Sequence, residues 1–234
     1  MVARVKLLKG RTGIVMLKIL RNFYKKSEAR YTSKVRDTSK ARDTKVGTVG
    51  ASSISVGRFT YGYEKISIKQ WGEGASLQIG SFCSLAENLT ILLGGNHRVD
   101  WATTFPFGHI FKDDLGGGEI IGHPVSNGDV VIGNDVWVGR NTTITSGVKV
   151  GDGAVIAASS HVVKNIGAYE IWGGNPARLI RKRFDDEIIQ ILLSLKWWDW
   201  EISSIQKIAP LLSQNPTVEI LKEIEKFSNE KEQP

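Results

Sequence analysis

Hydrophobic residues recur at every sixth position over one stretch of the chain, at Ile132, Val138, Ile144, Val150, Ile156 and Val162. A small residue follows four of these six positions, namely Gly133, Gly139, Gly151 and Ala157. An α-helix repeats every 3.6 residues and a simple strand every two, so neither accounts for a period of six. Short strands joined by tight turns, with three strands in a coil of roughly eighteen residues, produce this period in a parallel β-helix. We therefore predict that each aliphatic residue points inward and that the small residue lets the chain turn.

The same period occurs upstream in a different phase, at Ile79, Leu85 and Ile91. The 53 residues from Ile79 to Ile132 are not a multiple of six, which predicts an inserted loop at about 94–129. The insertion holds three of the four histidines and three phenylalanines between positions 105 and 111, a composition unlike that of disordered segments. A long loop that leaves a regular fold is typically functional.

After Pro176 the period of six stops and helical spacing begins. Apolar residues predict one helix through Ile188, Leu192 and Leu195, followed by two more at about 202–210 and 217–227. The predicted organisation is a basic extension at 1–45, a β-helix at 46–183 with the inserted loop 94–129, and a helical region at 184–234. We expect these helices to cap the open end of the β-helix, where unpaired strand edges would otherwise be exposed.

The 234 residues suffice for one sizeable core with appendages. Cys83 is the single cysteine, so an internal disulfide framework is excluded and a reducing cytoplasm is the expected compartment. It falls inside a predicted coil, which favours a buried, unreactive side chain.

The positive charge is concentrated at one end of the chain. Residues 1–45 carry fourteen Lys or Arg and three acids, a net +11, while the rest carries seventeen bases and twenty-one acids, a net −4. A short basic helix at about 14–24 is too short to span a bilayer and makes a poor signal peptide. Its favoured interpretation is an extension that packs on a neighbouring subunit or is solvated. Contact with an anionic membrane surface is the alternative, and nucleic-acid binding is not expected.

Several motifs occur in order along residues 50–210, and together they resemble those of the xenobiotic acetyltransferases, which modify chloramphenicol and streptogramins. They are Ile79-Gly-Ser-Phe-Cys-Ser, Gly95-Asn-His97-Arg98, Asp100-Trp101-Ala-Thr-Thr-Phe-Pro-Phe107, Ile132-Gly-Asn-Asp-Val-Trp137-Val-Gly139, Gly173-Gly-Asn-Pro-Ala-Arg178 and Lys196-Trp-Trp-Asp-Trp200. The resemblance implies a left-handed β-helix, a homotrimer, acetyl-CoA as the donor and active sites in clefts between subunits.

Through the same resemblance, His97 is the expected catalytic base, because histidine takes up a proton near neutral pH. Trp137 is expected beside the acetyl-CoA thiol, where its ring walls the pocket and its indole N–H donates a hydrogen bond. His109 and His123 lie in the same loop without matching motifs, so no role is predicted for them. No metal site is predicted, because there is one cysteine and the histidines lack ligand spacing.

Acetyl-CoA binding is expected from residues near the predicted turns and from bases where the coils end. The set is Trp137, Gly139, Ala157, Ser159, Lys164, Pro176, Arg178, Arg181 and Lys182, with Arg183 as a further candidate for phosphate. Contacts to the acceptor are expected from Tyr61, Tyr63, Glu64, Trp71, Asn96 and Phe105.

The antibiotic-acetylating members carry a longer, tyrosine-rich insertion where this chain has only the short segment 61–74, and they lack the basic extension. Both differences resemble the family's saccharide-acetylating relatives. The prediction is a cytoplasmic acetyltransferase that modifies a hydroxyl or amine of a bacterial saccharide, with antibiotic acetylation as the alternative. A non-catalytic scaffold is a second alternative, which His97 and Trp137 disfavour, and a nucleotidyl-sugar enzyme would need a βαβ domain for which the chain has no room.

Overall fold

A computed structural model describes residues 43–229. The predicted basic helix at 14–24 and almost all of the extension at 1–45 therefore lie outside the described residues. Within the described part, short parallel strands form three sheets, to which an antiparallel strand is added at one edge of each of two sheets.

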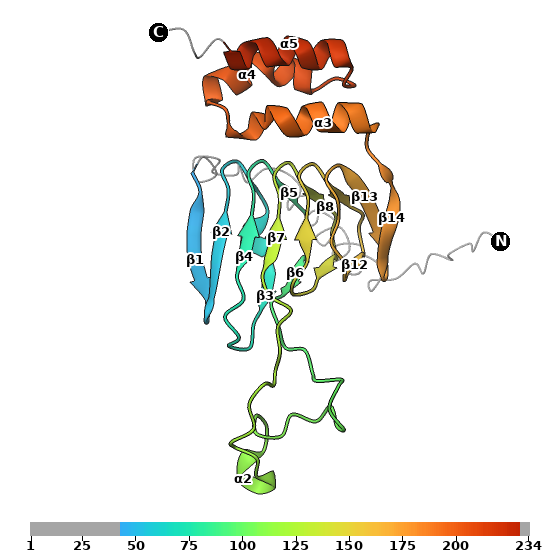
Figure 1. Ribbon diagram of the computed structural model, residues 1–234. Coiled ribbons are helices and arrows are strands. Elements are labelled where there is room, and N and C mark those ends of the chain that lie inside the picture. Colours follow the sequence, from blue (N-terminus) through green and yellow to red (C-terminus); the bar gives the residue numbers. More distant parts are fainter. Residues whose placement is uncertain (1–42, 230–234) are drawn as a thin grey trace, which may run out of the picture. The chain divides into compact units, whose positions relative to one another are not determined.

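The strands of each sheet come from successive coils (Figure 1). Sheet A contains, in spatial order, β1 (Lys45–Val49), β2 (Ser52–Val56), β4 (Leu77–Ile79), β7 (Val130–Ile132) and β10 (Lys149–Val150). Sheet B contains β14 (Ala177–Lys182), β13 (Glu170–Gly174), β11 (Val155–Ile156), β8 (Trp137–Val138) and β5 (Ser84–Leu85). Sheet C contains β12 (His161–Val162), β9 (Thr143–Ile144), β6 (Thr90–Leu92) and β3 (Ser67–Lys69). The chain visits sheets A, B and C in turn, which is the predicted parallel β-helix.

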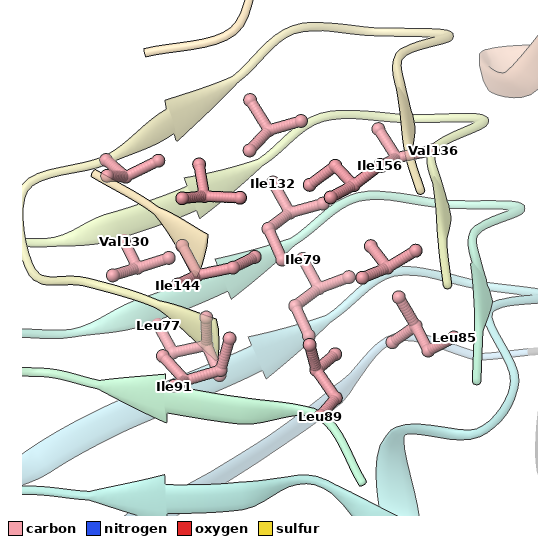
Figure 2. Packing of buried hydrophobic residues seen from close by; sticks show 14 of the residues in the cluster. Leu77, Ile79, Leu85, Leu89, Ile91, Val130, Ile132, Val136, Ile144 and Ile156 are labelled. Atoms are coloured by element: carbon pink, nitrogen blue, oxygen red, sulfur yellow. The ribbon is translucent and has the colours of Figure 1, made fainter. Parts of the chain in front are cut away.

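The register confirms the length of one coil. Trp137 pairs with Val155 in sheet B and Thr143 pairs with His161 in sheet C, a separation of eighteen residues in both cases. All six positions of the repeat are at most 3% exposed, as are Leu77 and Ile91 in the earlier coil. Figure 2 shows side chains of this core in the interior, among them Leu77, Ile91, Ile132, Ile144 and Ile156. Each contributes about 1.5–3 kcal/mol by its burial.

The turns differ from the prediction in one respect. The small residue after each buried aliphatic residue does not adopt the positive φ. The residue two positions after that small residue does, as at Asp135 (φ 53°) and Ser159 (φ 60°). The glycine is needed for a different reason. A Cβ on Gly139 would lie 2.5 Å from the backbone N of Ala158 in the next coil, so only glycine allows the coils to approach this closely.

The inserted segment leaves the coils after β6 and returns at β7 (Figure 1). It contains only one short helix, α2 (Lys112–Leu115). None of the residues from Gly95 to Asp129 is fully buried, although many are large and apolar.

Three α-helices follow the β13–β14 hairpin: α3 (Asp186–Leu195), α4 (Ile202–Leu212) and α5 (Val218–Asn229). Two 3-10 helices, η2 (Tyr63–Lys65) and η3 (Trp197–Asp199), complete the elements. The Asp185 carboxylate caps α3 by accepting a hydrogen bond from the N–H of Ile188 at 2.9 Å. The helices share a second core with Tyr169, Trp197 and Trp200.

The helices do not cap the end of the β-helix, so that prediction was wrong. They cover the corner between sheets A and B, where the Arg58 guanidinium donates to the Trp198 carbonyl at 2.8 Å. At the same corner, the rings of Phe82 and Trp197 are 4.9 Å apart. Large aromatic residues at this corner provide apolar surface that the helices bury. At each end of the β-helix an antiparallel strand is added instead, β1 beside β2 and β14 beside β13.

Candidate active site

The inserted loop begins and ends at a narrow ribbon, the loop neck, defined as residues 94–97 and 123–126. Asn96 and Val125 exchange two backbone hydrogen bonds of 3.0 and 2.9 Å across it. Two further bonds tie the neck to the coils. The Gly95 N–H donates to the Glu73 carboxylate at 2.8 Å, and the Asn96 amide donates to the Ser146 hydroxyl at 3.1 Å. These bonds hold the residues that follow the neck in a defined position.

His97 is the first residue of the loop with an exposed side chain. Its Nδ1 lies 2.7 Å from the carbonyl oxygen of Thr104. A carbonyl can only accept, so Nδ1 carries the hydrogen, and Nε2 of the neutral ring carries the lone pair. A nitrogen that is oriented in this way can take a proton from an incoming nucleophile.

The Arg98 side chain contacts other residues and is assigned no part in the proton transfer. Its guanidinium pairs with the Asp100 carboxylate and lies over the Trp101 ring at 4.9 Å. The hydrogen bond from Arg98 lowers the pKa of Asp100 to about 2, so the carboxylate stays ionised and offsets the positive charge beside His97.

His123 lies close to His97, and His109 lies close to His123, although no sequence motif selects either of them. The rings of His97 and His123 are 4.6 Å apart and nearly perpendicular, and His109 is 6.4 Å from His123. Burial lowers the pKa of His123, and the nearby His97, His109 and Arg98 lower it further. His123 therefore remains neutral at neutral pH.

Trp137 projects from the outer face of sheet B and is 57% exposed, although it stands beside the buried Val138. In the neighbouring coils, its register partners are Ser84 on one side and Val155 on the other. Tyr61 pairs with Ser84 in turn, so Tyr61 and Trp137 are two coils apart in one row. We call these positions the sheet B row: Tyr61, Ser84, Trp137 and Val155.

Within one chain, the two predicted catalytic residues lie on different sides of the β-helix. Trp137 lies on sheet B, whereas His97 lies in the loop that leaves from the corner between sheets C and A. The corner between sheets B and C and the whole of sheet C separate them along the coil.

The residues predicted to bind the donor fall into two groups. Five lie near Trp137, on sheet B or at its corner with sheet C: Gly139, Ala157, Ser159, Pro176 and Arg178. Three lie elsewhere. Lys164 is at the corner between sheets C and A, and Arg181 and Lys182 are at the opposite end of β14, where Lys182 pairs with Asp186.

Comparison with known proteins agrees with this architecture. A family model described as bacterial transferase hexapeptide (six repeats) matches residues 129–164. The chain is 46% identical over 153 residues to a probable macrolide acetyltransferase of Lysinibacillus sphaericus, covering 63% of this chain and 83% of that protein. It is 41% identical over 144 residues to a chloramphenicol acetyltransferase of Klebsiella aerogenes, covering 61% and 68%. It is 42% identical over 154 residues to virginiamycin A acetyltransferase of Staphylococcus aureus, covering 64% and 68%.

The chain belongs to the hexapeptide-repeat acetyltransferases. The predicted resemblance is thereby confirmed, and the protein is an acyltransferase enzyme.

In this acetyltransferase the residues predicted to contact the acceptor have different surroundings. Trp71 is 45% exposed and packs so closely on the loop neck that a Cβ on Gly95 would meet its ring at 2.6 Å. Tyr63 instead packs against the solenoid core, while Glu64 is exposed at the same turn. Phe105, next to Thr104, makes an edge contact with Phe107 at 4.9 Å.

Sequence reasoning missed three residues around the acetyltransferase's His97, namely Glu73, Thr104 and His123. Glu73 accepts bonds from two backbone N–H groups, those of Gly95 and Trp71, at 2.8 and 3.1 Å. Its position between two glycines was the only available signal. Thr104 acts through its carbonyl, which no side-chain pattern reveals.

Arg183 has a structural position rather than the phosphate contact that was considered for it. Its guanidinium donates to the Gly153 carbonyl at 2.7 Å and lies 3.4 Å from the Asp135 carboxylate. It also stacks on Tyr169 and Phe184, at 5.2 and 5.1 Å. A cavity of about 390 Å³ lies beside this group, under the helices. Burial raises the pKa of Asp135, and Arg183 partly counters this effect.

Within residues 43–229, no group of three or more His, Cys, Asp or Glu side chains is arranged to hold a metal ion. No helix in that range is long and apolar enough to cross a membrane.

Proposed function

We propose that this acetyltransferase moves the acetyl group of acetyl-CoA to a hydroxyl group of a saccharide, with His97 as the general base. The observation that carries the proposal is the Nδ1–H of His97 donating to the Thr104 carbonyl, which leaves Nε2 free. Nε2 takes the hydroxyl proton as the acceptor oxygen attacks the thioester carbonyl. The C–S bond then breaks, and the proton held by His97 passes to the sulfur of the leaving CoA.

The active site is assembled from two chains of a homotrimer. His97 and Trp137 are on different sides of the β-helix, so two copies are needed to bring them to a single cleft. The loop also exposes large apolar side chains, including Val99, Phe111 and Leu115. A single chain leaves this surface uncovered, and a neighbouring copy would bury it.

The donor lies along the sheet B row and the adjacent corner. Trp137 provides an apolar wall for the thioester end, and Gly139, Ala157 and Ser159 line the corner that the pantetheine arm follows. Arg178, which is exposed near Pro176 in the β13–β14 hairpin, would contact a phosphate of the donor. Lys164 belongs to the opposite corner and would reach the donor of a neighbouring site, while the ion pair of Lys182 with Asp186 disfavours a phosphate contact there.

The acceptor is assigned from the aromatic side chains around the cleft. Trp71 beside the loop neck and Tyr61 in the sheet B row are both partly exposed, and the small Ser84 lies between Tyr61 and Trp137. Exposed rings next to small polar groups suit the apolar face and hydroxyls of a pyranose. Antibiotic acetylation is the second candidate, because chloramphenicol and virginiamycin acetyltransferases are among the relatives.

The basic segment 1–45 has a separate role in this proposal. It attaches the enzyme to a neighbouring subunit or to the anionic inner surface of the membrane, and it takes no part in the chemistry. Deleting it would leave turnover of a soluble acceptor within a few-fold of wild type, and binding to anionic vesicles would weaken in a salt-dependent way only if it contacts the membrane.

A thiol-release assay with acetyl-CoA tests the acceptor assignment. The panel comprises free sugars, oligosaccharides, nucleotide-linked sugars, chloramphenicol and virginiamycin. Turnover of at least one saccharide, with both antibiotics poorer, is expected. Efficient turnover of an antibiotic with every saccharide inert would promote the second candidate.

A further inference from the structure

His123 has an unusual environment for a polar side chain. Both of its ring nitrogens are buried, and neither has a hydrogen-bond partner among the described residues. Buried polar atoms without partners are uncommon and call for a physical account. His123 belongs to the loop neck, the ribbon that positions His97, and directly precedes Pro124 and Val125.

The contact between the two imidazoles restricts how His97 can move. The hydrogen bond from Nδ1 to the Thr104 carbonyl fixes one point of the His97 ring, but the ring can still pivot about that bond. The His123 ring lies against it at 4.6 Å with an interplanar angle of 88°. A perpendicular ring at this distance is a favourable aromatic arrangement, and it blocks the pivot.

The charges around the pair allow this contact. The groups facing His123 are His97, His109 and Arg98. Arg98 is paired with Asp100, and burial disfavours a charged His123. A neutral ring can remain against His97 when His97 becomes positively charged during proton transfer, whereas a second imidazolium would be repelled.

We infer that His123 is a positioning residue, whose neutral ring holds the plane of His97 so that Nε2 points to the acceptor. The inference rests on the proposed role of His97 as the base. It assigns the effect to the shape of the ring and not to its nitrogens, because neither nitrogen has a partner in the described part of the chain.

Three variants test the inference: His123→Ala removes the ring, His123→Phe keeps a ring without nitrogens, and His109→Ala is the matched control. His109 is exposed, and its ring lies 6.4 Å from that of His123, whereas the rings of His97 and His123 are 4.6 Å apart. We expect His123→Ala to lower kcat by about 10- to 100-fold with an unchanged KM for acetyl-CoA, since a misdirected base slows only the chemical step. His123→Phe and His109→Ala are expected to stay within about threefold of wild type.

A second measurement does not depend on turnover. In trimers labelled with ¹⁵N-histidine, two-bond ¹⁵N–¹H correlations report which nitrogen of His97 carries the hydrogen. Wild type, His123→Phe and His109→Ala are expected to show one Nδ1–H form, and His123→Ala to show averaging of both forms. If His123→Ala does not assemble, His123→Phe still decides the question, because a tenfold loss in that variant would assign the effect to the nitrogens.

Wild-type kcat and a single His97 tautomer in His123→Ala would overturn the inference. Equal losses in the Ala and Phe variants would also overturn it. If no acceptor is turned over but the tautomer of His97 responds to His123→Ala alone, the proposed function fails and the positioning role stands.

Discussion

Two corners of the β-helix differ in how far the chain itself buries their residues. At the corner between sheets A and B, each coil turns within a few residues, and helices from the same chain cover the turns. Tyr169 at this corner is almost completely buried, and Phe82 packs on Trp197. At the corner between sheets C and A, one coil instead sends out the segment 94–129, in which no residue after Gly94 is fully buried.

The difference shows where a solenoid can place function. Every interior position is fixed by the coils above and below it, so only the turns can be elaborated without disturbing the core. At the corner between sheets A and B, apolar residues of the turns are buried by helices of the same chain, which stabilises the fold. The corner between sheets C and A keeps a histidine exposed and leaves apolar residues uncovered, and the proposed trimer would bury them. The following predictions test this contrast.

The largest expected effect is on catalysis at the exposed corner. His97→Ala should lower kcat by roughly 10²–10⁴, because the acceptor loses its base, while acetyl-CoA binding stays nearly intact. The measurement is thiol release together with direct titration of acetyl-CoA. His161→Ala is the control, since His161 lies in β12 and has no proposed role. Wild-type turnover by His97→Ala would remove this histidine from the mechanism.

A matched pair of truncations compares the coil with the loop. Ile156→Ala should cost about 2–5 kcal/mol of unfolding free energy, because Ile156 is fully buried and leaves a cavity. Glu119→Ala in the loop should change the unfolding free energy by no more than about 0.5 kcal/mol, since Glu119 is exposed and polar. Urea unfolding at one fixed protein concentration measures both. Equal losses would mean that the loop belongs to the folded core and that the contrast is wrong.

The sequence predicted the coils well because the repeat is local. The period of six identifies positions such as Ile144 and Ile156 from the sequence alone, and both are fully buried in the structure. It did not predict where the helices pack, because that depends on contacts such as Arg58 with Trp198, which are 140 residues apart. Motif resemblance selected His97, but motifs carry no information on a backbone carbonyl such as that of Thr104.

Mixing of two inactive variants tests whether neighbouring chains share a site. His97→Ala and a Trp137→Ala variant, denatured and reassembled together, should recover about one quarter of wild-type activity. In a trimer with random assortment, one interface in about four joins an intact His97 to an intact Trp137. Each variant reassembled alone is the control. If mixed trimers form without activity, either both residues come from one chain or the shared site is wrong.

A smaller effect is expected at the loop neck. Glu73→Gln replaces one carboxylate oxygen with an amide nitrogen, which cannot accept a hydrogen bond from the N–H of Gly95 or Trp71. The neck would then be held less firmly, and kcat/KM should fall by up to about tenfold. Steady-state kinetics measures this, with the exposed loop residue Glu119 changed to Gln as the control. Equal behaviour of the two variants would show that Glu73 does not position the neck.

The smallest effect is expected at the buried thiol. Cys83 is fully buried near the covered corner, its Sγ donates to the Gly133 carbonyl at 3.1 Å, and burial raises the pKa of its thiol to about 11. A raised thiol pKa lowers the thiolate fraction, so at pH 8 roughly one molecule in a thousand carries the reactive form. Mass spectrometry after brief treatment with a thiol reagent should therefore detect no adduct on the native enzyme and one adduct after unfolding. The matched variant Glu119→Cys places a thiol on an exposed, polar loop position, and it should gain one adduct in the native state. Rapid labelling of Cys83 in the folded enzyme would show that the covered corner opens as readily as the loop, and the contrast between the two corners would fail.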